Sequence, residues 1–353
     1  MLVLLIAVVT GAVALTNNKF SVKDGTEDAT KWTVKPTEAT TTGMAAGTQV
    51  KAKYSGKKKV KSIKAVKKAA AGPEGAINGK FTINDSGDQV YFSQGNLQAM
   101  YNGSAWLWAF AENQWDYIGG RSNSGSETQT GNNFINGNGT VSANCTVDLF
   151  GWVGASSTWT DATMYGISNS TITNRTDTYG NIVSENLKSD WGNTIGSGWR
   201  TLTKDEWNYL FITRTTGGTV GSTSQASFAH ATINIDGTSV NGMILFPDGV
   251  NFASTEFTTL DKVNHSSNWG TKCTSAQWTA LEGKGCVFLP AAGKRIGSTV
   301  INAGSDGCYW SSSPHTSIAK KASYVIFEYN FLSLRLGNYR DKGFSVRLIR
   351  AAE

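Results

Sequence analysis

The sequence predicts an α+β fold with long loops for most of the chain, preceded by a small basic β module. Three observations indicate it: short runs of β-forming residues recur from Lys80 onward, a helix start is clearly encoded at Thr203, and stretches 119–145 and 154–198 are long and polar. Charged residues make up 16% of the 353 residues and aromatic residues 11%, so the chain can build a core and does not belong to the disordered class.

Residues 1–15, MLVLLIAVVTGAVAL, form an apolar run. A bilayer-spanning helix takes about 20 apolar residues, so this run is too short to span a membrane. Ala12-Val13-Ala14 fits a small-residue cleavage site. We therefore predict a secretory signal and an exported protein, at the cell surface or extracellular, although no Lys or Arg precedes the run. The alternative is a buried N-terminal strand.

Segment 16–72 is predicted to be the small basic module. Its stretch 51–68, KAKYSGKKKVKSIKAVKK, holds nine Lys and no acidic residue; the chain totals +6, so the rest carries 6 − 9 = −3. Val50, Ala52 and Tyr54 alternate with polar residues before a Ser-Gly turn, which predicts a β-hairpin with a solvated Lys face. The alternative is binding to an anionic glycan or surface. Nucleic acid is not expected as a partner, because Tyr54 is the only ring in the stretch.

The run Ala69–Pro73 is typical of a linker, and we place the domain boundary there. The predicted parts are therefore a signal segment over 1–15, the Lys-rich module and linker over 16–72, and a ligand-binding domain over 73–353. The last part begins with strands at Lys80–Ile83 and Gln89–Phe92, joined by a turn of Asn, Asp, Ser and Gly.

The best-defined helix of the domain begins after Thr203. Thr203 and Glu206 have the spacing of a capping box. Trp207, Leu210 and Phe211 follow at helical spacing and are predicted to form the buried face.

The second half of the domain is predicted to hold one more helix and four strands. The helix covers Ser275–Glu282 and ends at Gly283. The strands are short and rich in β-formers; they are Cys286–Leu289, Cys308–Trp310, Tyr324–Phe327 and Ser345–Leu348.

Sequence motifs of enzymes and metal sites are missing from the chain. There is no GxSxG, no HExxH and no phosphate loop. The four cysteines, Cys145, Cys273, Cys286 and Cys308, lack zinc-ligand spacing, and only three His are present. We predict no catalytic residue, no metal and no cofactor. The cysteines can form two disulfides in an exported protein or stay as free buried thiols, and both alternatives stay open.

Several motifs occur in one order along residues 80–350. They are VYFSQGNLQ from Val90, FAENQWDY from Phe110, GWRTLT from Gly198, FLPAAG from Phe288, YWSSSP from Tyr309 and GFSVRL from Gly343. In this arrangement the chain resembles C-type-lectin-fold proteins of Bacteroidetes, including the variable proteins of diversity-generating retroelements. The segment after Trp199 is also similar to the formylglycine-generating-enzyme branch of that fold. That branch uses a C-terminal redox Cys pair, and no Cys follows Cys308 here.

The resemblance implies that Ala322, Val325 and Phe327 are core residues and that the positions between and after them face a ligand. The implied ligand-facing residues lie in the loop before that strand, within it and after it. They are His315, Ser317, Tyr324, Ile326, Glu328, Asn330, Phe331, Arg335, Asn338, Tyr339, Asp341 and Phe344. For Ile326 and Phe331 a place in the core is an equal alternative, whereas the run Asn338–Asp341 is expected to be exposed.

The predicted function is therefore binding. The resemblance implies an extracellular ligand-binding or adhesion protein whose partner is a protein or glycan on a cell, host or phage surface. Lys320, Lys321, Glu328 and Lys342 depart from the pattern that adenine-directed diversification produces, so the surface is either not diversified or carries fixed positions. The alternative function is a structural surface or pilus-type subunit that uses the same patch for assembly.

Overall fold

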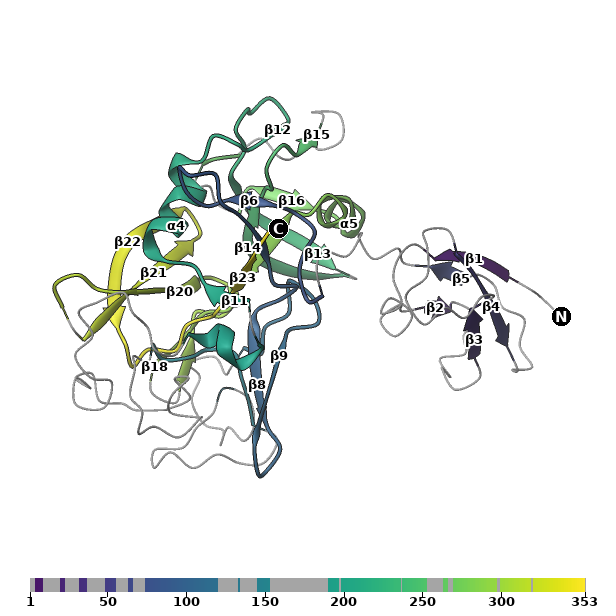
Figure 1. Cartoon of the computed structure of the whole chain (residues 1–353), viewed down its shortest axis with the longest axis horizontal. Helices are drawn as coiled ribbons and strands as arrows, with labels where there is room; N and C mark the ends of the chain where they lie inside the picture. The colour runs from purple at the N-terminus through teal and green to yellow at the C-terminus, as the bar shows by residue number, and fades with distance from the viewer. Residues whose placement is uncertain are drawn as a thin grey trace. The chain divides into compact units, whose positions relative to one another are not determined.

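The chain divides into two units, Met1–Ala71 and Gly72–Glu353, which are described separately here. In this computed structural model the described residues are 4–8, 20–22, 32–36, 48–54, 63–65, 74–119, 133, 145–152, 190–196, 198–235, 237–252, 263–265, 269–296, 299–318 and 320–352. Of Arg335 and Leu336 only the backbone is described. Most of the predicted loops at 119–145 and 154–198 therefore lie outside the described residues. Figure 1 shows the elements of both units.

The first unit contains short antiparallel strands. They are β1 (Leu4–Val8), β2 (Phe20–Val22), β3 (Trp32–Pro36), β4 (Thr48–Tyr54) and β5 (Ile63–Ala65). β4 lies between β1 and β3, and β5 pairs with β2. The predicted hairpin after Val50 is thus wrong in its pairing, because β4 finds its partners earlier in the chain. The N-terminal apolar run contains β1, and the secretory signal stays a prediction.

The second unit is built from several small sheets, and the prediction of an α+β C-type lectin fold is wrong. Strands make up most of its secondary structure, and α4 (Lys204–Asn208) and α5 (Ser275–Gly283) are the α-helices within the described part. The described part also contains a 3-10 turn, η2 (Trp191–Thr194), and a π-helical turn, η3 (Tyr209–Thr213). Sequence signals for helix were restricted to two short runs, whereas short β-forming runs recur throughout the domain.

The C-terminal strand lies in the interior of the sheet that joins the two ends of this unit. The sheet has the antiparallel order β11-β23-β7-β6. Its strands are β6 (Phe81–Thr82), β7 (Gln89–Phe92), β11 (Trp199–Thr201) and β23 (Leu348–Ala351). The C-terminus accordingly appears in the middle of the unit in Figure 1.

Two further sheets have four and three strands. One has the order β16-β13-β14-β17, and the other has the order β10-β8-β9. Their strands are β13 (Phe228–Ile235), β14 (Thr238–Leu245), β16 (Thr271–Cys273) and β17 (Val287–Pro290), then β8 (Leu97–Tyr101), β9 (Trp106–Phe110) and β10 (Thr146–Val147). The pairs β12 (Thr219–Val220) with β15 (Asn251–Phe252) and β18 (Lys294–Ile296) with β19 (Thr299–Ile301) are smaller.

The sheet that positions the predicted recognition residues is β20-β21-β22. Its antiparallel strands are β20 (Gly307–Pro314), β21 (Lys321–Glu328) and β22 (Phe331–Tyr339). Side chains of β21 alternate between two hydrophobic cores. Val325 and Phe327 pack in the first core, with Trp207 of α4. Tyr324 and Ile326 pack in the second core. Both faces of the central strand are therefore covered.

Two sequence predictions about the helices are confirmed and one is corrected. Thr203 Oγ1 accepts from the backbone N of Glu206, and the Glu206 carboxylate accepts from the backbone N of Thr203, which is the predicted capping box. The predicted buried face, Trp207, Leu210 and Phe211, is buried. Gly283 is the last residue of α5, and the left-handed residue that follows the helix is Gly285 at φ 86°.

Two further findings concern membrane-spanning helices and the cysteines. Among the described residues, no helix has the length and apolar composition that crossing a bilayer requires. All four cysteines are buried free thiols.

Candidate functional site

The predicted ligand-facing residues separate into three groups in the structure. The first group is buried: Tyr324, Ile326, Asp341 and Phe344 have at most 7% of their surface exposed. The prediction that Tyr324, Asp341 and Phe344 lie on the surface is wrong, and for Ile326 the alternative, a place in the core, is the one found. The alternation along β21 was predicted correctly, but its second face is covered by residues such as Trp310, whose ring centroid lies 4.3 Å from that of Phe344.

In the polar run after Asn338, Arg340 and Asp341 are buried, and each lies close to a group that interacts favourably with its charge. The Arg340 guanidinium lies 5.0 Å from the ring centroid of Trp152, and its Nε donates to the Trp152 carbonyl at 3.3 Å. Asp341 Oδ2 lies 3.4 Å from Lys342 Nζ. Long polar side chains can enter an apolar layer when their charged ends are satisfied in this way. Polarity alone was thus a poor guide to exposure.

The second group lies where β20 ends, β21 begins and β22 ends. We call it the His315 patch: His315, Ser317, Lys321, Asn338 and Tyr339, of which all but Lys321 were predicted. The backbone N of His315 donates to the carbonyl of Lys321 at 3.0 Å, and Lys321 pairs with Tyr339 across the sheet. The Lys321 ammonium lies 5.1 Å from the centroid of the Tyr339 ring.

The third group lies at the turn between β21 and β22. Glu328 pairs with Phe331, and Asn330 is at the turn between them. Phe331 has 43% of its surface exposed, and Tyr329, in the same turn, has 54%. Seven residue steps along β21 separate this turn from the His315 patch, about 24 Å at the usual strand rise. The predicted residues therefore form two separate surface regions. The side chain of Arg335 lies outside the described residues.

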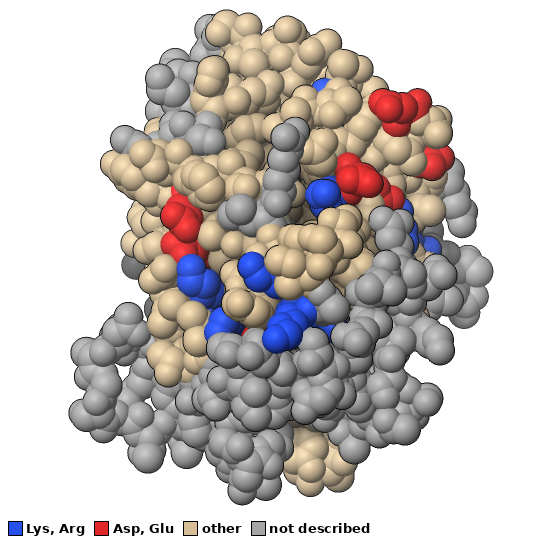
Figure 2. All heavy atoms as spheres, turned by 90° about the vertical axis from the view of Figure 1, so that its left-hand side faces the viewer, with Lys and Arg blue, Asp and Glu red and all other residues tan. Residues whose placement is uncertain are grey.

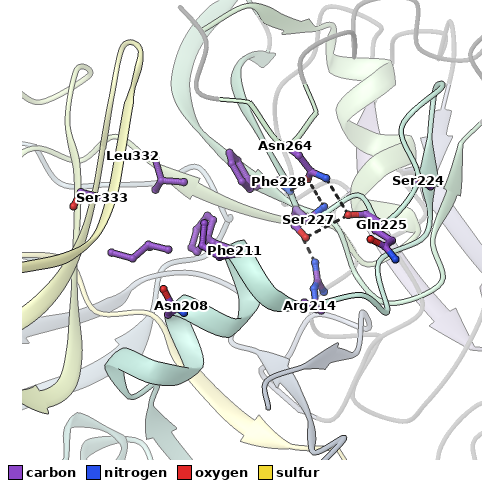
Figure 3. Close-up of a pocket in the computed structure, with 12 residues that line it drawn as sticks. Asn208, Phe211, Arg214, Ser224, Gln225, Ser227, Phe228, Asn264, Leu332 and Ser333 are labelled. Atoms are coloured by element: carbon purple, nitrogen blue, oxygen red, sulfur yellow. Dashed lines mark hydrogen bonds between the residues drawn. The ribbon is translucent and has the colours of Figure 1, made fainter. Parts of the chain in front are cut away.

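A groove next to the β21–β22 turn is a further candidate site. Its volume is about 600 Å3, within the range of small-molecule sites. Figure 3 shows Leu332 and Ser333 of β22 on one side, with Phe211 and Phe228 between them and the polar residues of the other side. It is lined by Asn208, Phe211, Ile212, Arg214, Ser224, Gln225, Ser227, Phe228, Asn264, Leu332, Ser333 and Leu334.

The polar side of the groove is held by one asparagine. Oδ1 of Asn264 accepts from the backbone N of Ser227 at 2.7 Å, and its Nδ2 donates to the Gln225 carbonyl at 3.0 Å (Figure 3). Asn264 has a φ of 61°, a left-handed conformation that Asn tolerates better than most residues. The Asn264 side chain therefore fixes the backbone of segment 225–228, which forms part of the groove wall.

Arg214 supplies the charge beneath this wall. Its Nη2 donates to the carbonyl of Phe246 at 2.7 Å, and its Nη1 donates to Asp248 Oδ1 at 3.2 Å. Burial lowers the pKa of Arg214, and the nearby Asp248 carboxylate opposes that shift. The guanidinium is therefore a buried, partnered cation that supports the groove.

The apolar side of the groove reaches solvent at Ile212. This residue sits in the π-helical turn η3 and has 64% of its surface exposed. In the sequence it follows the buried pair Leu210 and Phe211, so it falls outside the buried face. An isoleucine at such a position was a usable signal, which the sequence reasoning missed. The remaining groove residues come from separate loops and had no local signal.

Comparison with known proteins gives no relative for this arrangement. The chain matches no family model, no curated protein and no solved structure. Within the described part of the chain, no group of three or more His, Cys, Asp or Glu side chains is placed to hold a metal ion.

Proposed function

We propose that the second unit is a non-catalytic binding module of an exported adhesion or ligand-binding protein, and that its ligand occupies the groove beside the β21–β22 turn. The observation that carries this proposal is the exposed apolar rim of a groove of about 600 Å3. Ile212 lines the groove, and the exposed Phe331 precedes Leu332, which also lines it.

The chemistry of the groove supports binding over catalysis. Its polar members are amides, hydroxyls and one guanidinium, and none of its lining residues is a carboxylate, a thiol or an imidazole. Such groups orient a ligand by hydrogen bonds, while Phe211, Phe228 and the leucines supply apolar contact. A protein or glycan on another cell, a host surface or a phage offers ligands of this kind.

The test is binding of the full chain to intact bacterial and host cells and to an array of neutral and acidic glycans. Ile212→Ala and Phe331→Ala should each weaken binding by about 1–2 kcal/mol, as exposed apolar anchors do, with little change in melting temperature. Ile296→Ala is the matched control, because Ile296 is also exposed and lies outside the groove lining. Equal binding by all three variants, or no binding to any surface, would count against the proposal.

The assembly alternative has its own supporting feature. Within the described residues, β9 has a neighbour on one side only, and Leu107 at its centre has 47% of its surface exposed. An apolar edge strand is a template for pairing with another chain. In a structural subunit, Leu107→Lys at this edge would abolish oligomers seen by light scattering, because a charge on an edge strand opposes pairing with another chain. A wild-type chain that stays monomeric at high concentration would exclude this alternative.

A further inference from the structure

Two lysines and one histidine converge at the His315 patch, at the far end of β21 from the groove. Lys321 is joined to His315 by the backbone hydrogen bond described above. Lys204, at the start of α4, donates its backbone N to Ser313 Oγ at 3.0 Å, two residues before His315. Burial, then the charges of Lys321 and Lys204, lower the pKa of His315. Two backbone hydrogen bonds thus bring Lys204 of α4 and Lys321 of β21 next to the end of β20 that leads to His315.

The imidazole of His315 is held in one orientation. Its Nδ1 accepts from the backbone N of Ser317 and of Ile318, both at 3.2 Å. The ring occupies the space above Gly337, where a Cβ would lie 2.2 Å from Cδ2. Because Nδ1 is an acceptor, the proton of the neutral ring is on Nε2. The patch therefore presents an oriented N–H donor on a surface that also carries Lys321, whose ammonium lies over the Tyr339 ring.

These cations have no acidic partner among the described residues. Neither Lys204 nor Lys321 forms an ion pair there, whereas Lys294 and Lys342 each lie within 4 Å of a carboxylate. The positive charge is local, because residues 1–50 hold four Lys and four acids and residues 69–353 therefore carry the net −3. In Figure 2 the side of the second unit that carries β21 and β22 faces the viewer, and Lys and Arg gather near the middle of that face.

We propose that Lys204, His315 and Lys321 bind an oxyanion group, a sulfate or carboxylate, of an acidic polysaccharide. This site is separate from the groove and stands independently of it. Lysine ammonium groups and an imidazole N–H donate to such oxygens as charge-assisted or neutral hydrogen bonds. A polysaccharide is favoured over nucleic acid because the ring of the patch, Tyr339, is already covered by Lys321 and cannot serve as a stacking platform for bases.

The primary test is nuclear magnetic resonance of the full chain, which contains three histidines. His315→Gln assigns the signal. Addition of inorganic sulfate should raise the pKa of His315, because a bound anion stabilises the imidazolium form, and should leave His265 unchanged. This local readout is insensitive to the Lys-rich stretch 51–68. An unchanged His315 titration in saturating sulfate would overturn the proposal.

The second test separates the ligand classes. Chondroitin sulfate should bind, neutral dextran should not, and Lys204→Ala and Lys321→Ala should each weaken binding roughly two- to fivefold. Each should also lower the slope of log affinity against log salt by about 1. Lys80→Ala is the matched control, because Lys80 also lies over a tyrosine ring, that of Tyr91 at 5.7 Å. Equal loss in the control, or equal binding of single-stranded oligothymidine through the same lysines, would overturn the assignment to an acidic polysaccharide.

Discussion

Arg214 and Asp248 form an ion pair behind the wall of the groove, with Nη1 and Oδ1 3.2 Å apart. The other carboxylate oxygen, Oδ2, accepts from the backbone N of Thr82 at 2.8 Å and from Gln89 Nε2 at 2.9 Å. Asp248 thereby connects the first two strands of the second unit, β6 and β7, to the groove.

Replacing this carboxylate should destabilise the fold strongly. Asp248→Ala leaves the buried Arg214 charge without its partner, which typically costs about 3–5 kcal/mol. Chemical denaturation measures the free energy of unfolding. Asp85→Ala, at an exposed turn, is the control and should change stability by about 0.5 kcal/mol or less. A loss below about 1 kcal/mol for Asp248→Ala would show that the pair is not buried as described.

Tyr324 and Phe327 lie on opposite faces of β21, and both should behave as core residues. Tyr324→Ala and Phe327→Ala are each expected to cost about 3–5 kcal/mol, since each removes a buried aromatic side chain. Tyr339→Ala should cost about 1 kcal/mol or less, because that ring is only partly buried. Thermal unfolding of the three variants checks this order. If the Tyr324 variant were as stable as the Tyr339 variant, the assignment of Tyr324 to the core would be wrong.

The second face of β21 marks the limit of sequence reasoning about this sheet. Local patterns were sufficient for the alternation of Tyr324 and Val325, which the pleat of a strand determines, and for the capping box, which hydrogen bonds between near neighbours determine. Burial of the second face was not predictable, since the residues that cover it, such as Trp310 and Phe344, come from other parts of the chain. The groove was unpredictable for the same reason, because Asn264 and Leu332, which both line it, are brought together only by folding.

Asp148 should make stability depend on pH. Burial raises the pKa of its carboxyl to about 6, from an ordinary value of 3.8, against hydrogen bonds from Ile118 and Asn133. A raised folded-state pKa gives a stabilising contribution that is fully present below 3.8 and is lost as pH rises through about 6. Between pH 4 and pH 7 the free energy of unfolding of the wild type should fall by about 2 kcal/mol more than that of Asp148→Asn. Parallel pH profiles for the two proteins would contradict this assignment.

The four cysteines should be unreactive in the native protein. Burial raises the pKa of Cys273 and of Cys308 to about 12, so the thiolate is scarce at neutral pH. Iodoacetamide should label none of the four thiols in native protein at pH 8 and all four in denaturant, as mass spectrometry can count. Fewer than four labelled thiols in denaturant would indicate a disulfide, which is the other alternative that the sequence left open.

A strand covered on both faces also restricts how this protein can change during evolution. Each substitution within β21 changes one of the two cores. Selection would therefore eliminate most such substitutions because they destabilise the fold, whatever their effect on binding. Residues 315–318 and 328–331, beyond the two ends of the strand, have no such restriction. New binding specificities would therefore arise at these ends, in two regions that can change independently of each other.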